Sequence, residues 1–105
     1  MMLYGLADDV RQQMNDVFRR HAGIERVTLF GSRATNTYRV GSDIDLALTG
    51  QLSFNALLMI ADQLEELGTL YSFDVLDERR ITNVALREHI HRYGKVIYDA
   101  TQERT

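Results

Sequence analysis

Two apolar runs joined by a polar loop, at Leu29–Leu48, constrain the fold of this chain more than any other stretch. The first run ends at Gly31 and Ser32, and the second begins at two acids, Asp43 and Asp45. Short apolar runs are typical of buried strands, whereas a loop of small, hydroxyl and cationic residues is typical of a functional segment. The stretch therefore predicts two strands with a phosphate and metal site between them.

Alternating side chains in Ser42–Thr49 predict that its two acids point to the same side of a strand. Their Cα atoms would then lie about 6.5 to 7 Å apart, a spacing suited to holding cations. Carboxylates suit Mg²⁺, and a third acid would allow two ions to be bound. Asp74, in the later run Thr69–Leu76, supplies that acid, and we expect the competing Asp77 to lie beyond the strand end in a charged turn. The opposite face of the first strand, formed by Ile44, Leu46 and Leu48, is expected to face the core.

Small and cationic residues around the loop predict a phosphate site. Gly31 lets the backbone approach an anion closely, and Ser32 adds a hydroxyl donor at a strand-to-helix junction. Arg33 and Arg39 flank the pair and can offer planar donors to the same anion, although exposed arginines are commonly only solvated. Ser42 can cap its turn or contact a phosphate, and we favour the cap. The histidines, which lack metal-ligand spacing, are expected at the surface: His21, His89 and His91.

Three segments carry apolar residues at the three- and four-residue steps of an amphipathic helix. The first, Leu6–His21, is expected to be followed by Gly23 in a left-handed conformation. The second begins after Ser53 as its N-cap, and the third, Ile81–Tyr93, is less regular and ends at Gly94. The predicted apolar stripe of the second helix is Phe54, Leu57, Leu58, Ala61, Leu64 and Leu67.

The strand signals, together with these helices, predict the fold class. The predicted strands are Arg26–Phe30, Ser42–Thr49, Thr69–Leu76 and an edge strand at Lys95–Tyr98. We also expect a short helix or turn at Arg33–Tyr38 and a loose tail at Thr101–Thr105. Strands interleaved with helices indicate an α/β or α+β fold, with a small mixed β-sheet of three to four strands flanked by helices.

Composition excludes several functional classes. A length of 105 residues predicts a single domain, residues 1–105, and 45% hydrophobic with 26% charged residues predicts an ordered one. The chain has no cysteine, so we expect neither disulfides nor thiolate zinc, and a cytoplasmic location. No secretory signal and no run of about 18 apolar residues is present, which argues against a membrane partner. A net charge of −3, with both signs spread along the chain, argues against stable DNA binding.

The spacing of these residues resembles that of the nucleotidyltransferase superfamily related to DNA polymerase β. Its pattern is Gly-Ser, about ten residues, then Asp-x-Asp; here residues 33–42 form a ten-residue spacer, within a stretch that ends GSDIDLAL and is followed later by FDVLD. The resemblance implies that Asp43 and Asp45 bind Mg²⁺, with two ions in the site. It also implies that Asp74 is the third ligand and helps to activate the acceptor hydroxyl. It also implies that Gly31 and Ser32 hold the triphosphate of ATP.

The short length is similar to that of minimal nucleotidyltransferases, the MNT type. Such proteins act as antitoxins paired with a HEPN-domain RNase toxin, and transfer AMP from ATP to a tyrosine of that toxin. The resemblance thus implies a HEPN toxin as partner in a hetero-oligomer. Two alternatives remain open at this point: an antitoxin that only masks its partner by binding, and nucleotidyl transfer to a small molecule or an RNA end. The second is disfavoured by the lack of an evident acceptor domain and of a basic strip.

Overall fold

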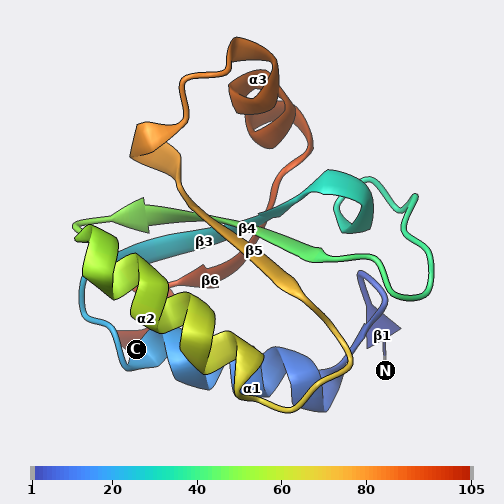
Figure 1. Ribbon diagram of the computed structural model, residues 1–105, viewed down its shortest axis with the longest axis horizontal. Helices are drawn as coiled ribbons and strands as arrows, with labels where there is room; N and C mark the ends of the chain where they lie inside the picture. The colour runs from blue at the N-terminus through green and yellow to red at the C-terminus, as the bar shows by residue number, and fades with distance from the viewer. Residues whose placement is uncertain (1, 105) are drawn as a thin grey trace.

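A four-stranded mixed sheet forms the centre of the computed structural model, which describes residues 2–104 (Figure 1). The strand order is β5-β4-β3-β6. Strand β5 runs parallel to β4, whereas the β3–β4 and β3–β6 pairs are antiparallel. The strands are β3 (Ile24–Phe30), β4 (Ile44–Gly50), β5 (Phe73–Asp77) and β6 (Lys95–Asp99). This arrangement confirms the predicted fold class and the position of the last strand at an edge.

The helices cover the sheet unequally. Helices α1 (Asp8–Arg19) and α2 (Phe54–Glu65) lie side by side on one face, and α3 (Val84–Tyr93) lies alone on the other (Figure 1). The main core is therefore between the sheet and the two paired helices, with side chains such as Phe18, Leu46 and Leu64 fully buried. A smaller cluster beneath α3 contains Phe30, Ala47 and Ile90. The alternation predicted for β4 is confirmed, since Ile44, Leu46 and Leu48 all join the main core.

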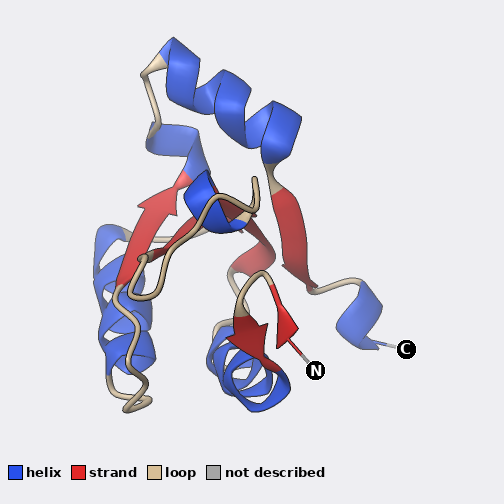
Figure 2. Cartoon of the chain, turned by 90° about the vertical axis from the view of Figure 1, so that its right-hand side faces the viewer, coloured by secondary structure: helices blue, strands red, loops and turns tan. Residues whose placement is uncertain are grey.

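The N-terminus differs from the prediction. Helix α1 begins at Asp8, because residues before it form a small hairpin of β1 (Met2–Leu3) and β2 (Leu6–Ala7), visible beside α1 in Figure 2. The turn residues Tyr4 and Gly5 both have positive φ angles. Gly23 is not left-handed, as was expected; its backbone instead packs against the Gln51 carbonyl, leaving no room for a Cβ atom. Glycine is favoured at position 23 because the Gln51 backbone lies too close for a side chain.

The predicted N-cap of helix α2, Ser53, is confirmed, whereas the predicted apolar stripe of this helix is partly wrong. The Ser53 hydroxyl accepts a hydrogen bond from the Ala56 amide at 3.1 Å. The fully buried side chains are Ile60 and Leu64, and the omission of Ile60 from the predicted stripe was wrong. Phe54 and Leu58, placed on that stripe, are 57% and 48% exposed. The buried face is rotated because α2 packs against both α1 and β5.

Later boundaries also shift. Strand β5 starts four residues later than predicted and ends at Asp77, which was wrongly placed beyond the strand in a turn. Helix α3 starts at Val84, capped by Asn83, after a 3-10 turn at Glu78–Arg80. The predicted loose tail contains a 3-10 turn at Gln102–Arg104, and Thr105 lies outside the described residues. Within residues 2–104, no helix has the length and apolar character needed to cross a membrane.

Candidate functional site

The Gly31 backbone lies directly against the Asp45 carboxylate. Strand β3 ends at Phe30, which pairs with Asp45 of β4 in the antiparallel register. Gly31 then turns away with φ +75°, a left-handed conformation that favours glycine. A Cβ atom at this position would collide with Asp45 Oδ2. Both the backbone angle and the space that the Asp45 carboxylate occupies therefore favour glycine at this position.

The second relationship joins Asp45 to Asp74. These residues are paired in the parallel register of β4 and β5, which places the two carboxylates on neighbouring strands. Burial raises the pKa of the Asp45 carboxyl above its usual value, and the negative charges of Asp74 and Asp43 raise it further. The neighbouring His89 and Arg33 side chains act in the opposite direction and lower the pKa of Asp45. A group of like charges of this kind favours a cation among them.

Asp43 is the third acid near Asp45 and Asp74, and it lies just before strand β4. It precedes β4, which begins at Ile44 rather than at the predicted Ser42, and its side chain is exposed, as is that of Asp74. Among residues 2–104, no three acidic, histidine or cysteine side chains already meet in a metal-binding arrangement. The donor chemistry nevertheless fits a hard ion such as Mg²⁺, since all three groups are carboxylates and Asp45 is held among like charges.

The turn that follows Gly31 is a 3-10 turn, Gly31–Arg33, tied down by its own backbone. The Gly31 carbonyl accepts hydrogen bonds from Ala34 and Thr35 amides, at 3.1 and 3.2 Å. The Ser32 carbonyl accepts one from the Thr37 amide at 2.9 Å. Within the described part of the chain, the Ser32 hydroxyl is half-exposed and has no hydrogen-bond partner, so it is available to a ligand.

His89 is a site residue that sequence reasoning missed. We expected it at the surface, but it is half-buried, and its Nε2 atom accepts a hydrogen bond from the Gly31 amide at 2.9 Å. Its ring also contacts Phe30 edge-on. A signal existed in the sequence: Leu86, His89 and Tyr93 recur at steps of three and four and so share one helical face.

Arg33 does not have the exposed position expected of a phosphate donor. Its side chain is only 2% exposed, and it donates hydrogen bonds to the Tyr4 carbonyl at 3.1 Å and the Ser42 carbonyl at 2.8 Å. Its guanidinium also lies over the rings of Tyr38 and Tyr71, with centroids 5.1 and 4.8 Å away. Arg33 thus joins the N-terminal hairpin, the site loop and the segment before β5.

Arg39 and Ser42 lie at the end of the loop between β3 and β4. Arg39 is exposed, and its backbone amide donates to the Ser42 hydroxyl at 2.8 Å. The turn-capping role favoured for Ser42 is therefore confirmed. The Arg39 side chain remains a candidate for contact with an anion.

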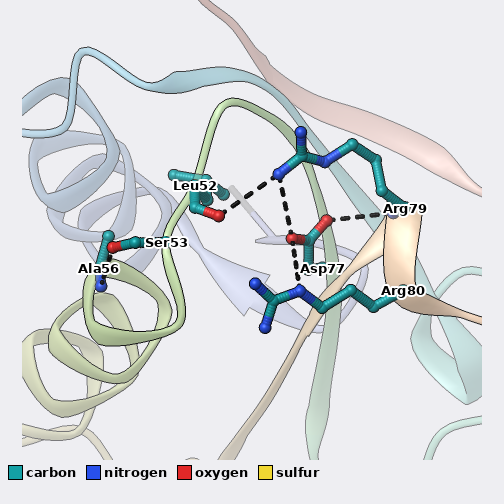
Figure 3. A network of polar contacts seen from close by, with 6 residues as sticks. All are labelled: Leu52, Ser53, Ala56, Asp77, Arg79 and Arg80. Atoms are coloured by element: carbon teal, nitrogen blue, oxygen red, sulfur yellow. Dashed lines mark hydrogen bonds and ion pairs between the residues drawn. The ribbon is translucent and has the colours of Figure 1, made fainter.

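The competing acid, Asp77, belongs to a separate structural network at the other end of β5 (Figure 3). It is 4% exposed, accepts a hydrogen bond from the Arg79 amide at 3.0 Å, and pairs with the Arg79 and Arg80 side chains at 3.5 and 3.6 Å. Arg79 also donates to the Leu52 carbonyl, just before the Ser53 cap of α2. This network attaches the turn after β5 to the start of α2.

Comparison with protein-family models found a match to Polymerase beta, Nucleotidyltransferase over residues 12–103. Comparison with curated proteins found no match.

Solved structures share the fold. A toxin-antitoxin crystal structure with AMP-PNP is similar with 24% identity and a TM-score of 0.70, over 89% of this chain and 76% of that one. A tri-AMPylated Shewanella oneidensis HEPN toxin in complex with MNT antitoxin gives 21% identity and a TM-score of 0.64, over 90% and 74%. The toxin-antitoxin MntA-HepT structure is similar with 21% identity and a TM-score of 0.65, over 92% of this chain and 76% of that one.

Proposed function

This chain belongs to the polymerase β nucleotidyltransferase family, and from that premise we propose that it is an MNT-type antitoxin that transfers AMP from ATP to a partner HEPN toxin. The favoured acceptor is a tyrosine hydroxyl of that toxin. Similar folds in a toxin-antitoxin complex with AMP-PNP and in a complex with an AMPylated HEPN toxin support the proposal. We propose a hetero-oligomer with the toxin, located in the cytoplasm.

The observation that carries the proposal is the arrangement around Asp45. Its carboxylate lies against the Gly31 turn on one side and is paired in register with Asp74 on the other. Phosphate-binding and acidic groups thus adjoin at the ends of three strands, as transfer of a charged phosphoryl group requires. The Ser32 hydroxyl, which has no hydrogen-bond partner within residues 2–104, lies in the same turn.

We propose that Asp43, Asp45 and Asp74 hold Mg²⁺, with two ions as the favoured number. Bound there, Mg²⁺ would supply positive charge to offset the triphosphate and the departing pyrophosphate. The raised pKa of Asp45, caused by burial and by its two acidic neighbours, supports this assignment, because a bound cation relieves that repulsion.

The remaining chemistry falls to the residues of the chain and the acceptor. The acceptor oxygen attacks the α-phosphorus of ATP, and the bond from that phosphorus to the bridging pyrophosphate oxygen breaks as the new bond forms. Asp74, which is exposed, accepts the proton of the hydroxyl. Ser32 donates a hydrogen bond to the triphosphate, and Arg39 can add a cation from the loop. Gly31, which has no Cβ atom, leaves room for the Asp45 carboxylate against the turn.

The direct test combines the purified chain, Mg²⁺, ATP labelled at the α-phosphate, and a HEPN protein encoded by a neighbouring gene. Label should move to a tyrosine of the partner, and intact mass should rise by AMP units. Asp43→Asn combined with Asp45→Asn should reduce transfer to background. Asp62→Asn, which removes an exposed acid from α2, is the matched control and should transfer normally.

The same experiment separates the proposal from its rivals. If the double Asn variant still neutralises the toxin without labelling it, the chain acts by masking. If label appears only on a small molecule or an RNA end, the acceptor proposed here is wrong. Absence of label with every acceptor, at millimolar Mg²⁺, would exclude nucleotidyl transfer.

A further inference from the structure

One side chain of helix α3 forms a hydrogen bond with the turn Gly31–Arg33. The helix lies alone on its face of the sheet, on the side opposite to α1 and α2 (Figures 1 and 2). From this helix, His89 Nε2 accepts a hydrogen bond from the Gly31 amide, with 2.9 Å between the two nitrogen atoms. The two residues are 58 positions apart in the sequence. Among residues 2–104, no other side-chain hydrogen bond joins α3 to this turn, so the position of α3 and the shape of the turn are coupled at this contact.

Neighbouring rings fix the orientation of the imidazole. Phe30 meets it edge-on, with centroids 6.3 Å apart and planes at 78°. Tyr93, one turn later on α3, lies with its centroid 5.4 Å away. Because the ring is held on both sides, its Nε2 lone pair is aimed at the Gly31 amide before any ligand arrives.

The contact also settles which groups of the turn are free. The Gly31 carbonyl is already bonded to two amides, and the Gly31 amide is bonded to His89. Both backbone polar groups of Gly31 therefore maintain the turn. The Ser32 hydroxyl, in the same turn, has no hydrogen-bond partner among residues 2–104 and can donate to a ligand.

We propose that His89 is a positioning residue for nucleotide binding. It holds the Gly31 turn so that the Ser32 hydroxyl and the metal held by Asp45 can both bind the same triphosphate. This inference rests on the proposed function, since it assumes that the turn binds ATP. His89 acts through Gly31 and does not contact the nucleotide. As an acceptor at Nε2, the neutral imidazole carries its proton on Nδ1.

Three variants test this role. His89→Ala removes the acceptor, and His89→Gln keeps an acceptor oxygen on a side chain of similar reach. His91→Ala is the control, because His91 is an exposed histidine on the same helix. Thermal unfolding identifies any variant that does not fold.

The kinetic readout is the ATP dependence of transfer. We expect His89→Ala to raise the KM for ATP about tenfold, the size of one lost hydrogen bond, with a smaller change in kcat. His89→Gln should restore most of the loss and His91→Ala should match the wild type. A KM for His89→Ala equal to that of the wild type, or a His89→Gln variant as impaired as His89→Ala, overturns the proposal.

A spectroscopic readout is independent of activity. In ¹⁵N-labelled protein without nucleotide, we expect scalar coupling across the hydrogen bond between the Gly31 nitrogen and His89 Nε2, and a large shift of the Gly31 amide in His89→Ala. A Gly31 amide that does not shift overturns the positioning role. Wild-type protein that shows the coupling and binds Mg-ATP but labels no acceptor overturns the proposed transfer and leaves the binding inference supported. Wild-type protein that binds no ATP overturns both.

Discussion

Asp45 of β4 and Asp74 of β5 are paired across two parallel strands, and the pairing brings two acids together from segments that are far apart in the sequence. Parallel neighbours need a crossover between them, here supplied by α2. Burial of the Asp45 carboxylate, and its repulsion from Asp74, cost stability in the free protein. We expect that cost to be visible in the pH dependence of folding.

The first prediction concerns Asp45→Asn. Because the pKa of Asp45 is raised in the folded protein, the folded state binds the Asp45 proton more tightly than the unfolded chain does. The contribution of Asp45 to the free energy of unfolding therefore falls as the pH rises above about 3.8, its usual pKa. Asp45→Asn should therefore raise the melting temperature at pH 7, and by less at pH 4. Differential scanning calorimetry at both pH values measures this. A variant less stable than the wild type at pH 7 contradicts it.

The Mg²⁺ dependence of stability gives the second prediction. If Asp43, Asp45 and Asp74 hold the ion, Mg-ATP should raise the melting temperature of the wild type, because a ligand that binds only the folded state stabilises it. Asp45→Asn should abolish this rise, and EDTA should reverse it in the wild type. Asp62→Asn should keep the full response. An equal rise in the Asp45→Asn variant would place the ion elsewhere.

Gly31→Ala is predicted to be more damaging than Gly68→Ala. Both glycines have positive φ, +75° and +71°. A Cβ atom at 31 would collide with Asp45, whereas a Cβ atom at 68 would have no atom of residues 2–104 within 4 Å. Gly68→Ala should thus cost only the backbone strain, about 1 kcal/mol. Gly31→Ala should cost about 2 kcal/mol or more. Urea unfolding of the two variants checks the order, and similar losses would show that the close approach to Asp45 is relaxed at little cost.

Arg33→Lys tests the structural role of the buried arginine. Lysine cannot reproduce both carbonyl hydrogen bonds and the contacts with two tyrosine rings. We expect a loss of about 2 to 4 kcal/mol in the free energy of unfolding. Arg39→Lys, in the exposed part of the same loop, should change stability by less than about 0.5 kcal/mol. If both substitutions were neutral, the three segments would not depend on Arg33.

The corrected face of α2 can be tested by truncation. Ile60 is fully buried, and Ile60→Ala should cost about 2 to 5 kcal/mol by leaving a cavity in the main core. Leu58 is 48% exposed, so Leu58→Ala should lower the free energy of unfolding by less than about 1 kcal/mol. Denaturant unfolding measures both. The opposite order would restore the stripe predicted from periodicity.

Local signals in the sequence determined much of the fold and the centre of the candidate site. Alternation in residues 42–49 located β4 and its buried face, and Ser53 identified the start of α2, because both signals depend only on neighbours in the chain. Gly31, Ser32 and the two acids at 43 and 45 were recognisable by spacing alone. Their roles with metal and nucleotide remain proposals.

Tertiary structure decided the partners of those residues. The sequence contains His89, but only the packing of α3 over Phe30 places its ring on the Gly31 amide. Arg33 becomes buried because an N-terminal hairpin supplies the Tyr4 carbonyl, and Asp77 because β5 extends one residue further than its pattern indicated. A helical or strand period fixes which side chains share a face. Which distant group meets that face depends on how the layers pack, and that is set by the whole core at once.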